Sequence, residues 1–324
     1  MKKNPLISIA ILNYNGLSYL KETLQAIRNL VYPNKEIIIV DNGSSDGSLE
    51  FIKKFKGVNL IQNGKNLGYS EGKNICVEKS NGKYVLLLDN DILIKNKFIL
   101  NQLVIKYKVS DKICFMALLM KDKGEETTKY YGIYYSFYGI NIHKPKLKIR
   151  DIISKKDAIL VGSFNGGAVF FEKDRWTKIG EYDKMQPIML DDFDVGARAY
   201  IRGYKNYLFN QSEVIHLGKQ RDIKKKYFAW KFKYYFSGIA TAMIKNYNLT
   251  NLIFRLPILF ISSIFIMFAL SFSKRNLYIF QSFFYSYLFF LINLPKILKN
   301  RIRAQLKRVI KEDIFLKIKP PKFK

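Results

Sequence analysis

The sequence predicts an α/β fold, with a doubly wound, mostly parallel sheet and flanking helices, followed by a C-terminal membrane-associated helical segment. Over about the first 110 residues, short apolar runs alternate with stretches whose apolar residues recur at helical spacing. Two of these runs end directly in an aspartate. The last third instead holds two long uncharged segments. The alternation is typical of βα repeats, and the long segments are typical of helices that contact lipid.

The expected elements follow in a β-α-β-α-β-α-β order, which implies parallel strands. They are a strand at 7–12, a helix at 17–30, a strand at 36–40, a helix at 48–55, a strand at 58–62, a helix at 70–80 and a strand at 83–88. Ligands bind beyond the carboxyl ends of such strands, so Asp41 and Asp89 are candidate site residues. Residues 111–160 are interpreted as irregular, and residues 160–218 as globular again.

The C-terminal third carries the two uncharged segments, at 256–272 and 277–294. A spanning helix needs ~20 apolar residues, so each segment is marginal. A transmembrane hairpin, an interfacial or re-entrant pair, and a buried pair of helices in a soluble domain all remain open. We therefore divide the chain into a globular domain at 1–218, a basic aromatic interfacial helix at 219–250, a hydrophobic hairpin at 251–295 and a basic cytoplasmic tail at 296–324.

The formal net charge is +29, and its placement indicates the partner. Nine basic residues between 219 and 255 and eleven between 296 and 324 flank the apolar segments. This arrangement favours anionic lipid headgroups over nucleic acid. The N-terminus leads into the first strand without a signal-peptide pattern, and Cys76 and Cys114 have no metal-ligand spacing. We expect the protein at the cell membrane with its globular domain in the cytoplasm.

Five ordered motifs carry the chemistry. They are Asn13-Tyr14-Asn15, Asp41-Asn42-Gly43-Ser44-Ser45-Asp46-Gly47, Asn66-Leu67-Gly68 with Lys73 and Asn74, Asp89-Asn90-Asp91, and Asp191-Asp192-Phe193-Asp194, with His216 after them. In this order the motifs resemble those of family 2 glycosyltransferases, which have the GT-A fold, over roughly residues 7–218. The rhamnosyltransferase-like members that assemble polysaccharides or lipid-linked glycans are the nearest in type.

The resemblance implies that Asn13, Tyr14, Asn15, Asp41 and Asn42 line the base and ribose of a nucleotide. An aspartate at a strand end accepts hydrogen bonds from such groups. The same aspartate could instead begin a turn and cap the next helix. We interpret Asp46, just before that helix, as a cap.

Phosphate and metal contacts are expected from the next two motifs. Gly68 permits close approach of the backbone, and Lys73 would be a point charge beside the diphosphate, where the family more often has arginine. Asp89 and Asp91, two residues apart after a buried strand, require a cation such as Mg²⁺ or Mn²⁺. The resemblance makes Asp91 the direct ligand, Asp89 and Asn90 donor contacts, and His216 a further metal or diphosphate ligand.

The Asp191-Asp192 pair supplies the catalytic base. In the family, the aspartate that matches Asp192 deprotonates the acceptor hydroxyl, and Asp191 is the second candidate. The family usually has glutamate at the position of Asp191, so fine positioning differs here. Asp194 is expected to bind Arg198. An acidic helix N-terminus without catalytic function is the alternative interpretation.

These features predict a metal-dependent, inverting glycosyltransferase that uses a nucleoside diphosphate sugar and a glycan or lipid-linked acceptor at the membrane. A transferase that glycosylates a polyprenyl phosphate is an alternative in the same class. A nucleotidyltransferase needs a basic loop after the first strand, and residues 13–18 contain no basic residue. A nucleic-acid-binding protein would explain the charge but not the paired aspartates, which repel phosphate.

Overall fold

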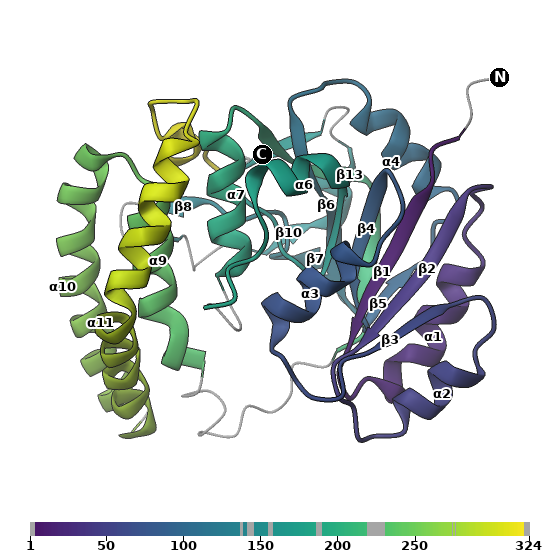
Figure 1. The fold of residues 1–324 in the computed structure, drawn as a ribbon, viewed down its shortest axis with the longest axis horizontal. Helices are drawn as coiled ribbons and strands as arrows, with labels where there is room; N and C mark the ends of the chain where they lie inside the picture. The colour runs from purple at the N-terminus through teal and green to yellow at the C-terminus, as the bar shows by residue number, and fades with distance from the viewer. Residues whose placement is uncertain are drawn as a thin grey trace.

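The computed structural model describes residues 4–136, 139–140, 146–154, 158–185, 190–218, 231–273, 275 and 277–320. Nine described strands form one mixed sheet in the order β11-β13-β6-β12-β4-β1-β2-β3, with β5 paired to β13 (Figure 1). β1 pairs in parallel with β2 and β4, β2 with β3, and β6 with β13. The mostly parallel α/β sheet predicted from the sequence is therefore confirmed.

The seven expected N-terminal elements are all present, and their ends differ from the predicted ones by at most two residues. They are β1 (Ile7–Asn13), α1 (Leu17–Arg28), β2 (Lys35–Asp41), α2 (Ser48–Lys54), β3 (Asn59–Gln62), α3 (Tyr69–Glu78) and β4 (Tyr84–Asp89). Two apolar clusters cover the two faces of the sheet, and alternate residues of β1 belong to different clusters. Ile9 and Ile11 share a cluster with α1 and α4, whereas Ala10 and Leu12 share one with α3 and α7. Burial on both faces explains the continuous apolar runs.

The second half of the sheet was only partly predicted. Its elements are β5 (Ile92–Ile94), α4 (Ile99–Tyr107), β6 (Ile113–Asp122), β11 (Ile159–Val161), β12 (Ala168–Glu172), α6 (Lys173–Ile179), α7 (Asp191–Ile201) and β13 (Lys205–His216). The described residues between β6 and β11 form short strands and one short helix: β7 (Thr127–Thr128), β8 (Tyr135–Ser136), β9 (Gly139–Ile140), β10 (Leu147–Lys148) and α5 (Ile149–Ile153). The interpretation of 111–160 as irregular is wrong for β6, which is buried from Ile113 to Met120 between β12 and β13.

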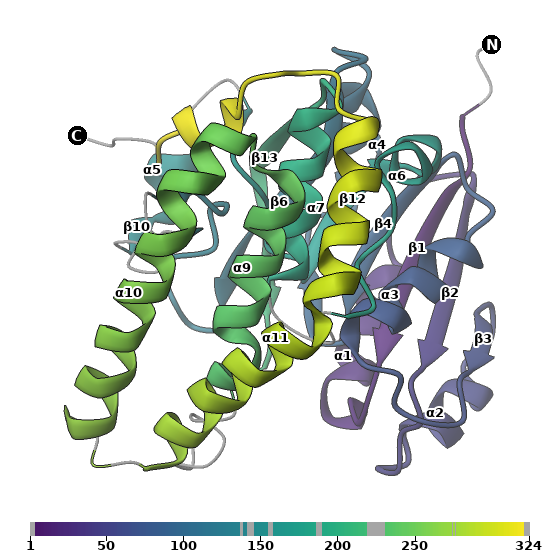
Figure 2. The same cartoon turned by 60° about the vertical axis from the view of Figure 1, so that its left-hand side comes forward.

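The C-terminal elements are η1 (Lys231–Tyr234), α9 (Tyr235–Asn246), α10 (Leu249–Ser273), α11 (Leu277–Leu306) and η2 (Ile314–Lys317). α9 lies between α7 and α11 and is buried along its length from Phe236 to Asn246 (Figures 1 and 2). This corrects the prediction of an interfacial helix for the described part of 219–250. One apolar core cluster contains residues of β1, α7, α9 and α11, so the core continues across residue 218.

α10 and α11 contain the two uncharged segments and are long and apolar enough to cross a membrane by length and composition. They stand beside the globular domain and do not project away from it (Figures 1 and 2). Asp313, near η2, accepts hydrogen bonds from Asn248 and Asn251 at the start of α10. In the second half of α11, Arg301 donates to the carbonyl oxygens of Ile244 and Tyr247. Both helices are thus attached along one side of the domain.

Candidate active site

Asn13 joins the carboxyl ends of three strands. Its fully buried amide donates to Asp41 Oδ1 at 2.8 Å and to Ser48 Oγ at 3.0 Å, and its Oδ1 accepts from Asn90 Nδ2 at 2.8 Å. Asn13 and Asp41 are the last residues of β1 and β2, and Asn90 directly follows β4. The sequence therefore located this group correctly at one edge of the sheet, and the hydrogen bonds hold the three strand ends in fixed relative positions.

Asp41 is buried and bonded to the turn that follows it. Its carboxylate also accepts from Ser44 Oγ at 2.6 Å and from the backbone N–H groups of Gly43 and Ser44. This is the turn-forming arrangement weighed above as the alternative. Tyr14, which is 46% exposed, is more accessible. The proposed contact of Asp41 with a nucleotide stays a prediction.

The neighbouring polar residues also organise loops. Asn42 donates to Asn66 Oδ1 and the Gly68 carbonyl and accepts from Leu67 N–H, which ties the segment before α3 to β2. Gly68 has a φ of 87°, a conformation that side chains disfavour. Asn15 (φ 50°) accepts from Ser45 N–H.

The interpretation of Asp46 as a cap is confirmed. Its carboxylate accepts from the N–H of Leu17 at 2.9 Å and from that of Ser48 at 3.0 Å. These are the first residues of α1 and α2, whose terminal N–H groups have no partner within their own helices.

Lys73 lies beneath Asp89. Its ammonium is 0% exposed and pairs with Asp89 Oδ1 at 2.7 Å, which also accepts from Tyr69 Oη at 3.1 Å. The predicted contact of Lys73 with a diphosphate finds no support in this geometry, because the buried ammonium cannot reach an exposed phosphate. Lys73 instead neutralises and orients Asp89, whose carboxylate is partly exposed.

Asp91 and His216 meet at the ends of β4 and β13. His216 Nε2 lies 3.2 Å from Asp91 Oδ2, and His216 Nδ1 lies 3.0 Å from Asp122 Oδ1. The hydrogen bond to Asp91 outweighs partial burial and raises the pKa of His216 to about 9. A Cβ at Gly218 would collide with Asp91 Oδ2, so glycine permits this close approach.

The pair fits a divalent cation that completes its coordination with substrate. Asp91 Oδ1 is buried and has no hydrogen-bond partner in the described part of the chain. The described residues contain no cluster of three or more His, Cys, Asp or Glu side chains that could hold a metal alone. Mg²⁺ and related ions commonly take one or two protein carboxylates and fill the remaining positions with phosphate and water.

Asp191 and Asp192 begin α7 and form a pair of neighbouring carboxylates. Asp192 Oδ2 accepts from Gly166 N–H at 2.7 Å, and Oδ1 accepts from Tyr182 Oη at 3.0 Å. Burial raises the pKa of both carboxyls, and the charge of Asp191 adds to the increase at Asp192. A carboxylate held in place with a raised pKa is suited to accept a proton near neutral pH.

A pocket of about 300 Å³ is lined both by residues at the ends of β4 and β13 and by the acidic start of α7. Its lining includes Asp89, Asp191, Asp192 and His216, together with Leu190 at the start of α7. Gly166 and Gly167 form part of the wall, where a Cβ on Gly166 would lie 2.5 Å from Asp192 Oδ1. His216, one of the two candidate metal ligands, and the candidate base Asp192 therefore line the same pocket.

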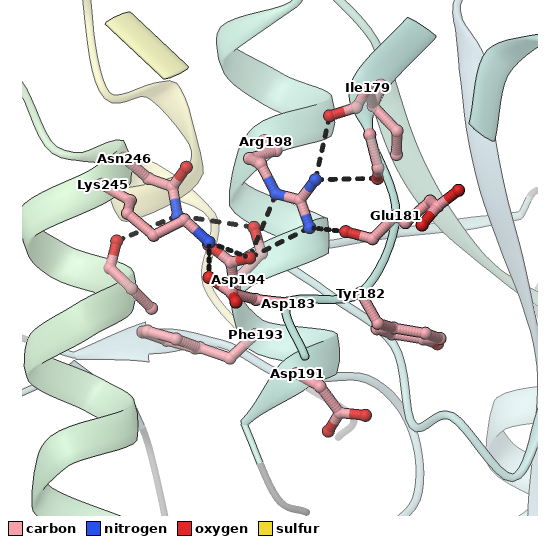
Figure 3. Close-up of polar contacts among 12 residues, drawn as sticks. Ile179, Glu181, Tyr182, Asp183, Asp191, Phe193, Asp194, Arg198, Lys245 and Asn246 are labelled. Atoms are coloured by element: carbon pink, nitrogen blue, oxygen red, sulfur yellow. Dashed lines mark hydrogen bonds and ion pairs between the residues drawn. The ribbon is translucent and has the colours of Figure 1, made fainter. Parts of the chain in front are cut away.

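A buried ion network surrounds Asp194 on α7 (Figure 3). Asp194 bonds to Arg198 Nη2 at 3.0 Å, as expected, and also to Lys245 Nζ at 2.9 Å and Asn246 Nδ2 at 2.7 Å. Burial would raise the pKa of Asp194, but the charges of Arg198 and Lys245 outweigh it and hold the pKa at about 2. Lys245 also pairs with Asp183 at 2.7 Å.

Sequence reasoning gave Lys245, Asn246 and Tyr182 no role in the site, although Tyr182 lies in the motif Gly180-Glu181-Tyr182-Asp183, which resembles the Gly-Phe-Asp turn of the family. Arg198 donates to the carbonyl oxygens of residues 179–181, which fixes the loop that carries Tyr182 and Asp183. A lysine among the small apolar residues of α9 was the available signal for a buried ion pair, since such a lysine is seldom buried without a partner.

Residues 8–174, just over half of the chain, match the family model for glycosyl transferase family 2. The chain belongs to this family. A glycosyltransferase of uncharacterized function from Haemophilus influenzae is 39% identical over 103 residues, which cover 31% of this chain and 41% of that protein. The putative teichuronic acid biosynthesis glycosyltransferase TuaG of Bacillus subtilis is 29% identical over 27% of this chain and 36% of the relative. The matched stretches thus span well under half of these relatives.

Solved structures agree in fold. GalNAc-T7 with UDP, GalNAc and Mn²⁺ has a TM-score of 0.56 at 16% identity and covers 76% of this chain and 51% of its own. Residues 1–349 of Staphylococcus aureus TarS with UDP give 0.54 at 15% identity, over 96% of this chain and 90% of that one. The Pyrobaculum calidifontis mannosyltransferase PcManGT, with GDP-Man and Mn²⁺, gives 0.53 at 14% identity, over 94% and 75%. At these identities the likeness establishes the GT-A-like fold.

Proposed function

We propose that this glycosyltransferase transfers a sugar, with inversion, from a nucleoside diphosphate sugar to a hydroxyl of a glycan or lipid-linked acceptor. The observation that carries the proposal is the pocket in which Asp192 faces Asp89 and His216. An inverting displacement needs a base on one side of the anomeric carbon and charge stabilisation for the leaving diphosphate on the other. The pocket contains the raised-pKa carboxyl of Asp192, and its lining residue His216 contacts Asp91, the other member of the candidate metal pair.

Each residue has a role in this proposal. Asp192 accepts the proton of the acceptor hydroxyl, and hydrogen bonds from Gly166 N–H and Tyr182 Oη hold its carboxylate in position. Asp89, fixed by Lys73 and Tyr69, contacts the donor. Asp91 and His216 would hold Mg²⁺ or Mn²⁺, which stabilises negative charge on the leaving diphosphate. Structural neighbours crystallised with Mn²⁺ and UDP or GDP-Man support this choice of donor class and ion.

The relatives support an acceptor that belongs to a glycan of the cell surface. Besides TuaG, the poly-β-1,6-N-acetyl-D-glucosamine synthase of Staphylococcus epidermidis is 34% identical over 91 residues, which cover 27% of this chain and 22% of that protein. We infer that the product is part of a polysaccharide or a lipid-linked glycan. The synthesis would take place at the cytoplasmic face of the cell membrane, with the globular domain in the cytoplasm.

The arrangement of α10 and α11 favours a seat in the plane of the membrane over a spanning hairpin. Because both helices are packed along one side of the domain, a hairpin perpendicular to the bilayer would draw the domain into the hydrocarbon (Figures 1 and 2). The outer face of α10 is apolar, with Phe254, Ile261, Phe265 and Phe268 exposed. A helix with such a face lies at the boundary between headgroups and acyl chains.

A labelling experiment separates these two topologies. The Arg275→Cys protein, whose new cysteine lies between α10 and α11, is added to preformed sealed vesicles and treated with a membrane-impermeant maleimide. The in-plane seat predicts labelling from outside, as for a Lys317→Cys control on the exposed surface. Protection of residue 275, with residue 317 still labelled, would establish a spanning hairpin. The native Cys76 and Cys114 are buried.

The reaction is tested on the detergent-purified protein with UDP-, GDP- and dTDP-sugars, with Mn²⁺ or Mg²⁺ against EDTA. We expect metal-dependent release of nucleoside diphosphate from one donor. Asp91→Ala should abolish metal-dependent donor binding, whereas Asp192→Asn should retain donor binding and lose roughly 10²–10⁴-fold in transfer rate. Asp111→Asn, on the surface, is the control. An Asp192→Asn protein with full transfer activity would show that another group is the base.

A further inference from the structure

A second pocket, of about 320 Å³, lies between α6, α7 and the second half of α11. Its lining includes six basic side chains, Lys178, Arg198, Arg202, Lys245, Arg303 and Lys307, against the two acidic ones Glu181 and Asp183. This pocket is distinct from the one that contains Asp192, since the two have no lining residue in common. Such an excess of cations around one cavity attracts anions.

Only part of this positive charge is compensated within the protein. Arg198 and Lys245 are held by Asp194 and Asp183 in the network described above. In the part of the chain that the structure describes, no carboxylate lies within ion-pair distance of Lys178, Arg202, Arg303 or Lys307. The pocket therefore keeps a net positive charge after its internal pairs are formed.

Arg202 gives an independent indication of a missing anion. Its Nε is buried and has no hydrogen-bond partner among the described residues, while its Nη1 donates to the Lys307 carbonyl. Burial, and then the charge of Arg198, lower the pKa of the Arg202 guanidinium. A buried donor on a cation is costly when it has no acceptor. An anion bound against the Arg202 side chain, which lines the pocket, would offset the repulsion from Arg198.

The position of the pocket on α11 indicates where the anion comes from. Asn300 and Arg303 lie three residues apart on one face of α11, and Lys307 directly follows the helix; all three line the pocket. Leu298, Ile302 and Leu306 form a separate exposed apolar face on the same turns. A basic face next to an apolar one is the pattern of a helix at the level of lipid headgroups.

We propose that this pocket binds a phosphate group, carried by the headgroup of an anionic membrane lipid. The side chains of Arg202, Arg303 and Lys307, which all line the pocket, are the ligands, and arginine is well suited to phosphate oxygens. The proposal builds on the in-plane membrane seat, but not on the transfer reaction. Free phosphate has the same recognition chemistry, so the test includes both sources.

The test compares two double variants of the full-length protein that lose equal charge from α11 and the residue that follows it. Arg303→Gln/Lys307→Gln removes two pocket cations, and Lys296→Gln/Lys299→Gln removes two exposed cations outside the pocket. In one arm, binding is measured to vesicles of phosphatidylcholine with and without phosphatidylglycerol. In the other arm, the melting temperature in detergent is measured in inorganic phosphate and in chloride of equal ionic strength.

Both variants should lose the same general attraction to an anionic surface. We expect the pocket variant to lose about tenfold more affinity for phosphatidylglycerol vesicles than the control, because it also loses charge-assisted hydrogen bonds. Selective loss in the vesicle arm alone identifies a lipid headgroup. Stabilisation by inorganic phosphate that only the pocket variant loses shows that free phosphate also fills the site. Equal behaviour of the two variants in both arms would overturn the proposal, and since neither arm measures transfer, that result leaves the proposed reaction untouched.

Discussion

Replacing Lys245 by methionine tests whether the buried network couples α9 to α7. Lys245 Nζ lies 2.9 Å from Asp194 and 2.7 Å from Asp183, and methionine retains most of the side-chain volume without the charge. The change leaves two carboxylates with less compensation in a buried site. Removing one partner of a buried ion pair costs about 3–5 kcal/mol. We expect a loss near the lower limit, about 3 kcal/mol, because Arg198 and Asn246 still bond to Asp194.

The pKa of Asp194 gives a second estimate. It is about 2 in the folded protein against an ordinary value of 3.8. At about 1.4 kcal/mol per unit, this difference corresponds to roughly 2–3 kcal/mol of stability, to which Arg198 and Lys245 are the largest favourable contributors. Because the folded pKa is the lower one, this stability is present above about pH 4 and is lost as the pH falls towards 2. In the variant the pKa of Asp194 should rise, so that part of the stabilisation is already absent at neutral pH.

Thermal unfolding of the detergent-purified protein measures the effect. A loss of about 3 kcal/mol corresponds to a decrease of roughly 5 °C in Tm for a protein of this size. The matched control is Lys317→Met, which removes an exposed, solvent-screened pair with Glu312 and should leave Tm almost unchanged. If the two variants unfolded at the same temperature, the network would not stabilise the fold and the reasoning would be refuted.

Three further predictions concern the site and the membrane. Gly166→Ala should lower kcat with little change in donor binding, because the new Cβ would lie 2.5 Å from Asp192 Oδ1. An unchanged kcat would mean that the Asp192 carboxylate can move aside without losing its function. The transfer rate should rise with pH through a pKa well above 3.8, because burial raises the pKa of Asp192 and the base must be deprotonated to act. A kcat that stays constant down to the pH at which an ordinary aspartate titrates would contradict this. Phe265→Asp should weaken vesicle binding by about tenfold or more in a flotation assay. Ile105→Asp should not, although Ile105 is 70% exposed and Phe265 is 72% exposed. Equal effects would show that the surface that contacts the membrane lies elsewhere.

The sequence was sufficient for the first half of the sheet and for the positions of most candidate site residues. Buried parallel strands are recognisable as short apolar runs, and an aspartate at the end of such a run must lie at the carboxyl edge. This logic placed Asp41 and Asp89 correctly. It did not reveal that Asn13 bonds to both Asp41 and Asn90, because these contacts join residues 28 and 77 positions apart.

Two errors have a common origin in the dense lysines of this chain. β6 is a continuous apolar run, but the lysine-rich segments on both sides of it gave the region a polar average, and its partners β12 and β13 are far away in the sequence. Lys245 was counted with the membrane-facing basic block, although its partner Asp194 lies 51 residues earlier. A count of charges does not distinguish a solvated lysine from one paired inside the protein.

The burial of α9 determines how this enzyme can be divided. A fragment ended at residue 218 would lose Lys245 and Asn246, leave Asp194 with Arg198 as its remaining cationic partner, and expose the face of α7 that α9 covers. Such a fragment would be expected to aggregate even though it contains every residue of the candidate active site. Solubility is better sought by changing the outer faces of α10 and α11 in the intact chain, where polar substitutions reduce the exposed apolar surface and leave the packing of α9 against α7 in place.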